Sequence, residues 1–542
     1  MHSNYVPEHS VDGLLTYANV RQQARLKPER ILLIALLLLT LALRVTHINY
    51  NTLFVDEAIY ATLGHEVMNE NFSQNAPSWM FGSYLYPYIV GVADELGGVV
   101  AIRLLSALLS MMAVVFVYLT AKSIFGEMAA LAAVLIFGLT GPSISLGQQA
   151  VIDALSMPLL AMALYLIITA ALTPDRERQY LVAAGIAFTL SFLAKYISVL
   201  LLPALFGVWV VLHIFDGKSL WKIFTGFKWI WFVLPVALIA GIYGAVFSAE
   251  LREVFKAENA TQIATRLDVV NTVVQEIGIG VVLALLGLAL VLVEAYRAIR
   301  PVAPATRRAQ IRFRIQFVLI ALGMTGALFS MQLYHFATAN IRSLWKHDVF
   351  TLVFLAPLAG YAIVRLIRYA QTVSGSNARE RRMFIAAVLF TTSVLFVNNA
   401  QNMNWSYQYS WPNASRTVRF LKTLDLSRDS FVMAAGSTVY EYYLQLRGDN
   451  RTLWFSMWFM EYQGTFGEQA IRSAVGNCAL EVVILDDYYS PEWNPVLIPL
   501  LDQAGYQMVF SDLQVLSFGD PIGTRVFLPG DWGACGSRVE NG

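Results

Sequence analysis

Charged residues and cysteines are both scarce in this chain. Asp, Glu, Lys and Arg make up only 14% of its 542 residues, whereas soluble proteins contain about 25%. With 57% hydrophobic residues, the chain is not disordered. Its net charge of +1 points to no nucleic-acid partner. The two cysteines, Cys478 and Cys535, exclude a disulfide-stapled secreted domain and lie in no zinc or redox motif. A membrane protein that crosses the bilayer several times remains.

Long apolar runs account for most of the first 400 residues. A bilayer core needs about 20 helical residues, and by this measure we predict about eleven spans. The apolar stretch 180–215 is too long for one crossing, so it predicts a tight helical hairpin broken at Lys195 and Pro203. The spans are expected at residues 30–49, 99–121, 127–145, 151–172, 180–197, 198–215, 229–247, 276–296, 315–334, 348–366 and 383–399.

Lys and Arg residues are distributed unevenly between the loops. Residues 297–314 contain six arginines, whereas the loop 50–98 contains neither Lys nor Arg. Because basic residues favour the cytoplasmic side of a membrane, we predict a cytoplasmic N-terminal segment, 1–29, in a multi-pass protein of the cell membrane. An odd number of spans then places the C-terminus outside.

The residues after about 400 differ in character, because apolar runs shorten to strand length at 431–435 and 482–485. Short helix-like segments alternate with them, which predicts an extracytoplasmic α/β domain over residues 401–542. We expect it to be accessory rather than catalytic. Its best polar patch is Asp486-Asp487-Tyr488-Tyr489, although an ordinary loop at the end of a strand explains that sequence as well. Whether Cys478 and Cys535 form a disulfide stays open.

The first outer loop, 50–98, holds the most informative polar residues. Asp56 and Glu57 follow the first span closely and precede apolar residues at helical spacing. The pair therefore starts a short amphipathic helix on the outer surface. Capping of that helix explains an acid there, but it does not explain an acidic pair against the membrane with no counter-ion in the loop.

The segment 54–60, Phe-Val-Asp-Glu-Ala-Ile-Tyr, resembles the Asp-Glu motif of protein O-mannosyltransferases and the related aminoarabinose transferases. Residues 82–88, 103–106, 194–203 and 354–360 are similar to further segments of the same group, in the same order. The resemblance implies a polytopic helical GT-C fold, with a transmembrane glycosyltransferase domain over 30–400 and a catalytic loop at 50–98. It also implies a polyprenyl-phosphate sugar as donor.

Further site residues follow from the resemblance and from charge. Asp153 begins the fourth span on the outer side, where an acid is costly, and the family has an acid in this loop. Some relatives carry a Lys near 82–86, where this chain has Gly, Ser and Tyr, so the donor phosphate needs other partners. We expect Arg342 and Lys346 to bind it, with Tyr84 and Tyr86; simple anchoring of these cations at the interface is the alternative.

No metal or other cofactor is predicted, because His335 and His347 lack the spacing of a helical metal site.

These residues favour an inverting glycosyltransferase that transfers a sugar to an acceptor hydroxyl of a protein, lipid or glycan on the outer face. In this hypothesis Asp56 is the general base, and Glu57 and Asp153 support it. A transporter or lipid flippase is the alternative. That class of protein is expected to carry ionisable residues near the middle of the bilayer and to show repeat symmetry.

Overall fold

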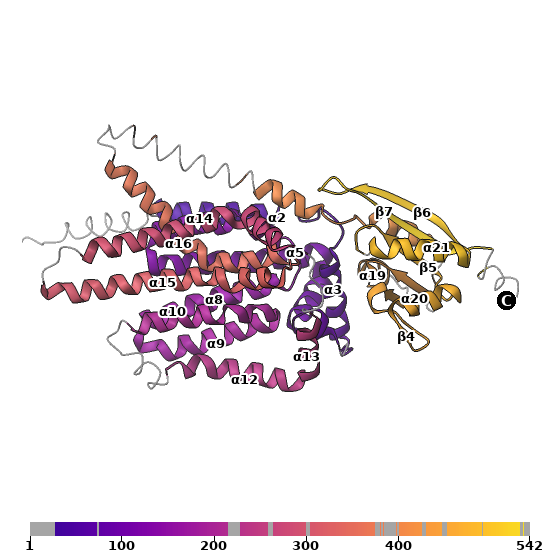
Figure 1. Ribbon diagram of the computed structural model, residues 1–542, viewed down its shortest axis with the longest axis horizontal. Helices are drawn as coiled ribbons and strands as arrows, with labels where there is room; N and C mark the ends of the chain where they lie inside the picture. The colour runs from indigo at the N-terminus through magenta and orange to yellow at the C-terminus, as the bar shows by residue number, and fades with distance from the viewer. Residues whose placement is uncertain are drawn as a thin grey trace, which may run out of the picture.

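The computed structural model describes residues 28–72, 75–214, 228–257, 264–299, 304–373, 400–424, 430–446, 453–489 and 491–531, and the single positions 380, 383, 397, 426 and 535. The predicted segment 1–29 and the predicted span 383–399 lie almost entirely outside these residues. A helical bundle occupies one end of the molecule and a smaller domain with a β-sheet the other (Figure 1).

The bundle is built from long apolar helices that run side by side (Figure 1). Five helices of the described residues are long and apolar enough to cross a bilayer, or six if one bent pair counts as a span. The polytopic helical architecture is therefore confirmed, whereas the number eleven stays a prediction. The bundle helices are α2 (Pro28–Val45), α5 (Leu85–Phe125), α6 (Glu127–Leu139), α8 (Asp153–Leu172), α9 (Glu177–Ala194), α10 (Leu202–Ile214), α12 (Ile230–Val246), α14 (Arg266–Ile299), α15 (Pro304–Thr338) and α16 (Leu344–Val373).

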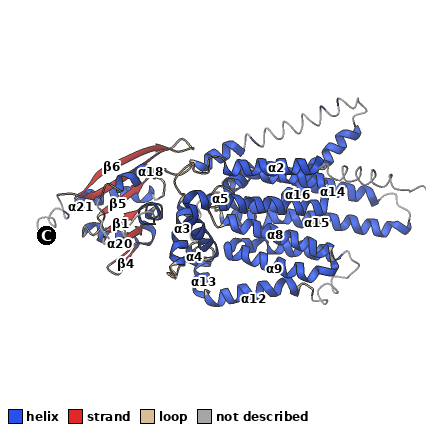
Figure 2. Cartoon of the chain, turned by 180° about the vertical axis from the view of Figure 1, so that it is seen from behind, coloured by secondary structure: helices blue, strands red, loops and turns tan. Residues whose placement is uncertain are grey.

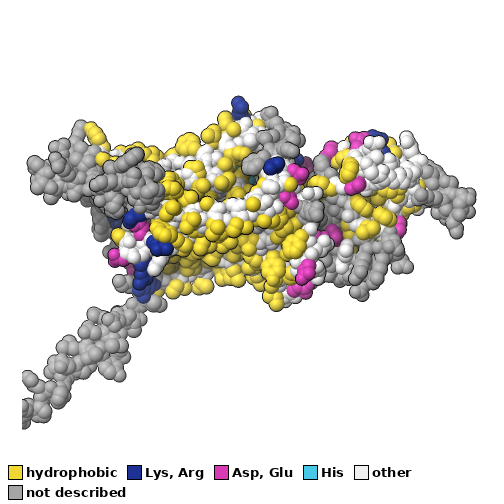
Figure 3. Space-filling view, turned by 90° about the horizontal axis from the view of Figure 1, so that it is seen from below, with side chains coloured by type: hydrophobic (Ala, Val, Ile, Leu, Met, Phe, Trp, Pro, Cys, Tyr) yellow, Lys and Arg dark blue, Asp and Glu magenta, His cyan; other side chains and the backbone are white. Residues whose placement is uncertain are grey.

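Apolar side chains cover much of the outer face of the bundle (Figure 3). Leu108 on α5 and Val282 on α14 are 63% and 64% exposed. Such a surface is unfavourable in water but suits lipid tails.

Polar side chains nevertheless cross-link the inside of the bundle. The fully buried guanidinium of Arg44, in the last turn of α2, donates to the hydroxyls of Ser110 and Ser143 at 2.8 and 2.9 Å and to the carbonyl of Gly138 at 3.0 Å. These partners belong to α5, α6 and α7 (Gly141–Leu146). One buried cation, with its donors satisfied, thus joins four helices.

Two breaks shape the end of the bundle that faces the second domain. Gly97 and Gly98 interrupt α5, and Gly98 has a φ of 63°, which a residue without a side chain adopts at little cost. The second break bends α12 against α13 (Ser248–Ala257), by 93° between Ile230–Val246 and Ser248–Val254. Together with α3 (Val55–Met68) and α4 (Ala76–Trp79), these pieces form a layer across the end of the bundle (Figures 1 and 2).

The C-terminal domain contains a five-stranded sheet with the order β2-β1-β5-β7-β6. Strand β1 is parallel to β2 and to β5, whereas β7 is antiparallel to β5 and β6. The strands are β1 (Phe431–Ala434), β2 (Leu453–Ser456), β5 (Val482–Asp486), β6 (Tyr506–Val515) and β7 (Pro521–Pro529), and a small hairpin holds β3 (Glu461–Tyr462) and β4 (Thr465–Phe466). The predicted strands 431–435 and 482–485 are β1 and β5.

Helices pack on both sides of this sheet (Figure 2). Val439 of α19 (Ser437–Glu441) belongs to the core on one side, and Ile471 of α20 (Gly467–Gly476) and Leu497 of α21 (Asn494–Ala504) belong to the core on the other. A further short helix, α18 (Ser415–Leu421), precedes β1. The expectation that short helices alternate with the strands of this domain agrees with α18, α20 and α21.

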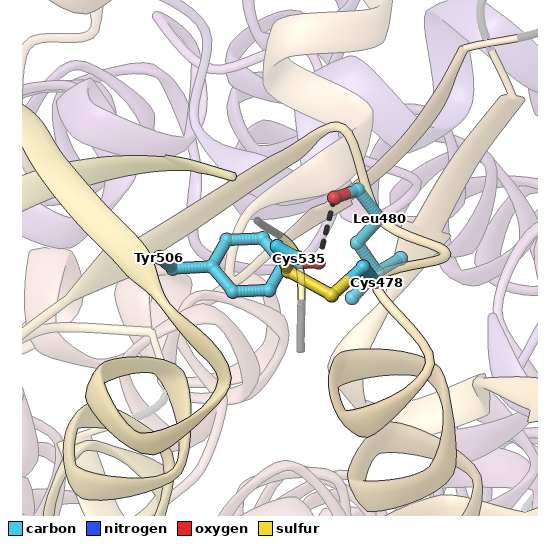
Figure 4. The surroundings of a disulfide bond; sticks show 4 residues. All are labelled: Cys478, Leu480, Tyr506 and Cys535. Carbon is cyan, nitrogen blue, oxygen red and sulfur yellow. Dashed lines mark hydrogen bonds between the residues drawn. A yellow bond between two sulfur atoms is a disulfide. The ribbon is translucent and has the colours of Figure 1, made fainter. Parts of the chain in front are cut away.

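The pairing of the cysteines is settled by the structure. Cys478 and Cys535 form a disulfide (Figure 4). It ties the chain beyond β7 to the turn between α20 and β5, where the hydroxyl of Tyr506 also donates to the carbonyl of Leu480 at 2.7 Å.

Candidate active site

The acid that begins α3 lies against a lysine from the start of α16. The Nζ of Lys346 donates to Oδ2 of Asp56 at 2.7 Å; the lysine side chain is 5% exposed and the aspartate 31%. Asp56 does not cap the helix, because Phe54 is the N-cap residue and Asp56 lies inside the first turn. The capping explanation for Asp56 is therefore wrong, and its carboxylate is directed to a partner 290 residues away.

Glu57, the next residue, is enclosed on every side. Its carboxylate receives two hydrogen bonds from the guanidinium of Arg103 at 2.8 and 2.9 Å, and both side chains are 0% exposed. It also accepts from the backbone N–H groups of Phe54 and Ala150, each at 2.9 Å. The loop 50–98 holds no counter-ion for the acidic pair, but α5 and α16 each supply one from outside the loop.

Arg103 also binds the short segment, residues 48–52, that leads into α3. Its guanidinium donates to the carbonyls of Ile48, Asn51 and Thr52 at 3.0, 3.1 and 3.3 Å, and its charge lies 4.2 Å from the centre of the Tyr50 ring. Glu57 and Arg103 thus fix the chain that leads into α3, and Asp56 is positioned as a consequence.

Asp153 and Lys195 form a second acid–base pair beside the first. The Nζ of Lys195 donates to Oδ1 of Asp153 at 2.6 Å, and both side chains are almost fully buried. Among the described residues, Oδ2 of Asp153 has no hydrogen-bond partner. The charges of Asp56 and Asp153 both act on Lys346. The structure therefore gathers two carboxylates and two ammonium groups from α3, α8, α16 and the break between α9 and α10.

The other predicted phosphate contacts lie in different settings. Arg342 is exposed, in the turn before α16. Tyr84 is half-buried and its ring contacts those of Phe72 and Phe247. Tyr86 is fully buried behind Tyr60, with a ring-centre distance of 5.6 Å. The structure therefore does not bring Tyr86 to a surface that a phosphate can reach.

Two hydrogen-bonded histidines, His335 and His347, lie near Lys346. Nδ1 of His335 is 2.6 Å from the carbonyl of Asn340, and Nε2 of His335 is 2.6 Å from Nδ1 of His347. Both rings are buried. Because a carbonyl only accepts, His335 must donate through Nδ1, so two neutral rings require His347 to donate to His335. No three His, Cys, Asp or Glu side chains among the described residues are placed to hold a metal ion.

Lys195 and Arg103, which complete the pairs with Asp153 and Glu57, can be noticed in the sequence because they are charged. Lys195 interrupts the apolar stretch 180–215, and Arg103 follows the break of α5. Both are cations in apolar surroundings, where an unpaired charge is expensive. Their partners, Asp153 and Glu57, are 42 and 46 residues away, so only the fold identifies them.

The sequence and the fold were compared with those of known proteins. Residues 82–243 match the family model described as dolichyl-phosphate-mannose-protein mannosyltransferase. None of the curated proteins matches the chain.

Solved structures with a similar fold cover nearly the whole chain. ArnT from Cupriavidus metallidurans in the apo state is 15% identical, with a TM-score of 0.57, over 92% of this chain and 96% of that one. The same protein bound to undecaprenyl phosphate gives a TM-score of 0.52 at 15% identity, over 91% and 97%. The archaeal oligosaccharyltransferase AglB from Archaeoglobus fulgidus, in complex with an inhibitory peptide and a dolichol-phosphate, gives 0.51 at 13% identity, over 91% and 74%. The family model thus matches one part of the chain, residues 82–243, and the chain as a whole shares the fold of ArnT and AglB.

Proposed function

We propose that the protein transfers a sugar from a polyprenyl-phosphate donor to an acceptor hydroxyl on the outer face of the membrane, with inversion at the anomeric carbon. The observation that carries this proposal is the cluster of Asp56, Lys346, Asp153 and Lys195 at one end of the bundle. Undecaprenyl phosphate and dolichol-phosphate are the molecules bound in two structures of similar fold. The absence of basic residues from the loop 50–98 supports the outer location and a cytoplasmic N-terminus.

Asp56 is the general base of this proposal. It is the more exposed of the two adjacent acids, and only one of its oxygens is held by Lys346. The acceptor hydroxyl gives its proton to Asp56 while its oxygen bonds to the anomeric carbon. The bond from that carbon to the phosphate oxygen breaks, and the electron pair leaves with the polyprenyl phosphate. Attack on the face opposite the leaving group inverts the configuration.

The leaving phosphate gains negative charge, so fixed cations stabilise the transition state. Lys346 has three N–H donors and commits one of them to Asp56. Lys195, held by Asp153, lies next to it, and exposed Arg342 can add a planar fork from the turn before α16. Tyr84 stays a candidate at the rim, whereas buried Tyr86 contributes packing.

The two remaining acids act through other residues. All of the hydrogen bonds of Glu57 go to Arg103 and to the backbone at the start of α3 and near α8. We therefore assign Glu57 the role of a positioning residue for Asp56. Asp153 orients Lys195, and its second oxygen is left for a sugar or acceptor hydroxyl.

The test uses purified protein in liposomes without any ion gradient, and a panel of radiolabelled undecaprenyl-phosphate hexoses and pentoses. Release of the sugar to water or to an added acceptor is measured for the wild type and for Asp56→Asn. Loss of the base should lower turnover by about 10²–10⁴. Asp502→Asn, an exposed site on α21, is the matched control and should keep full activity.

Near-normal transfer by a well-folded Asp56→Asn variant contradicts the assignment of the base. The same liposomes are also tested with an ion gradient: gradient-coupled uptake of the donor without any transfer contradicts the enzyme as a whole and favours the transporter or flippase.

A further inference from the structure

β1 and β5 are neighbouring parallel strands whose carboxyl ends lead to opposite faces of the sheet. After β1 the chain enters α19 on one face, and after β5 it enters α21 on the other. In open α/β sheets this arrangement splays the two loops apart, and ligands bind in the space between them. Here the two loops are Ala435–Gly436 and Asp487–Tyr489.

The loop after β5 is held by its acids, which leaves its aromatic rings at the edge. Asp486 accepts from the backbone N–H groups of Tyr488 and Tyr489 at 2.9 and 2.5 Å. Asp487 accepts two hydrogen bonds from Arg525, at 2.9 and 3.0 Å. The polar patch expected at this sequence is thus a rigid turn, and its carboxylates are not available to a ligand.

The rings of the two tyrosines are packed but not covered. Tyr489 lies so close to the loop after β1 that a side chain at Gly436 would meet its ring at 3.0 Å. Tyr488 contacts Tyr489 edge to face, at a ring-centre distance of 5.0 Å, and both residues are half-buried.

This edge of the sheet faces the candidate active site. The segment before α18 binds the chain that leads into α3: Nε1 of Trp411 donates to the carbonyl of Thr52 at 3.1 Å, and its ring lies 5.2 Å from that of Phe54. The ammonium of Lys346 lies 5.7 Å from the same Phe54 ring. Tyr488 is close enough for the charges of Asp56 and Lys346 to act on its hydroxyl.

We propose that Tyr488, supported by Tyr489, binds the acceptor and that the acceptor is a carbohydrate. The inference rests on the proposed function. The donor's phosphate is assigned to Lys346 and Lys195 on the membrane side of Asp56, so the acceptor must approach from the C-terminal domain. The half-buried ring of Tyr488 offers its exposed part to the C–H groups of a sugar ring, and its hydroxyl, already hydrogen-bonded to Ser410, lies beside it to meet a sugar oxygen.

The charges around this junction support a neutral acceptor. The charges of Asp56 and Asp486 act on both tyrosines, whereas the charge of Lys346 acts on Tyr488 alone, so acids outnumber bases around the two rings. Such surroundings disfavour an anionic group. Tyr488 orients the hydroxyl that loses its proton to Asp56, and it does not take up that proton itself.

The experiment separates binding of the acceptor from chemistry on the donor. Purified full-length protein in liposomes receives a labelled undecaprenyl-phosphate sugar, either alone or with increasing concentrations of octyl glycosides. Tyr488→Ala should raise the KM for the octyl glycoside about five- to tenfold, while release of the sugar to water stays within about twofold of the wild type. The KM of Tyr488→Phe for the octyl glycoside should lie between that of the wild type and that of Tyr488→Ala. Phe466→Ala, which removes a ring that is 68% exposed in the β3–β4 hairpin, is the control.

Three results overturn the inference. The first is an unchanged KM in Tyr488→Ala, and the second is a parallel loss of transfer and hydrolysis. The third is a wild type that releases sugar to water, or transfers it to a Ser/Thr peptide, but transfers none to any glycoside. A wild type that neither hydrolyses nor transfers any donor contradicts the proposed function instead, so the two failures are distinguishable.

Discussion

The two ends of α3 carry acids in opposite electrostatic settings. At the N-terminal end, Asp56 and Glu57 each pair with a cation, Lys346 and Arg103. At the C-terminal end, Glu66 lies near Glu441 of the C-terminal domain, and burial raises the pKa of both carboxyls. The helix dipole favours acids at the first end and disfavours them at the second. The acids are therefore paired with cations where we place the chemistry, whereas protonation of Glu66 and Glu441 is favoured at the domain junction.

The two adjacent acids at the N-terminal end of α3 differ in how deeply they are buried. Glu57 is fully buried and saturated with hydrogen bonds, whereas Asp56 is 31% exposed and holds a single ion pair. Removing Glu57 leaves the charge of Arg103 fully buried, whereas removing Asp56 leaves Lys346 near Asp153 and next to a position that water can reach, so the first loss is the more costly. We therefore expect Glu57 to contribute mainly to stability and its neighbour Asp56 mainly to the chemistry.

The largest expected effect tests this difference between Glu57 and Asp56. Glu57→Gln should lower the free energy of unfolding by about 3–5 kcal/mol, because Arg103 then stays buried without its counter-ion. The melting temperature in detergent reports this loss, and Asp56→Asn is the comparison, with a clearly smaller decrease. The double variant Glu57→Leu/Arg103→Met should recover part of the stability. Equal decreases in Glu57→Gln and Asp56→Asn would contradict the division of roles.

How much the sequence predicts depends on the range of the interaction. The helix after Asp56 and the strands β1 and β5 follow from local patterns, and the structure has them. The pairing of Asp56 with Lys346 spans 290 residues and has no local signature. The local sequence also does not predict how deeply Tyr84 and Tyr86 are buried. They are two residues apart, yet one lies at the rim and the other is fully buried, because the turn into α5 decides which ring faces inward.

The second expected effect concerns the difference between a buried cation and an exposed one. Arg342 is exposed at the turn before α16, only four residues from buried Lys346. If Arg342 contacts the donor phosphate, Arg342→Ala should raise the KM for the donor about tenfold, the size of one charge-assisted hydrogen bond. Arg342→Lys should restore part of it, since the charge returns without the fork. Donor kinetics that are unchanged in both variants remove Arg342 from the site; Arg472→Ala, on α20, is the control.

The smallest expected effect concerns the other end of α3. Burial, and secondarily the charge of Glu66, raise the pKa of Glu441 to about 7. A carboxyl with a raised pKa favours the folded junction below its ordinary pKa near 4.5, and that contribution is lost as the pH rises through about 7. The other titratable groups at this junction are His65, Asp94 and Glu95, and the hydroxyl of Tyr442 donates to Asp94 at 2.7 Å. Wild-type protein should therefore melt at a lower temperature at pH 8 than at pH 6.

Glu441→Gln removes the group that titrates, so most of this decrease should disappear. The expected difference between the variant and the wild type at pH 8 is about 2 °C, because Glu441 is partly exposed and shares its surroundings with Glu66. Glu492→Gln, at an exposed position of the C-terminal domain, is the control and should follow the wild type at both pH values. If the melting temperature of Glu441→Gln falls as much between pH 6 and pH 8 as that of the wild type, the Glu441 carboxyl is not the cause. The raised pKa at the C-terminal end of α3 then has no consequence for stability.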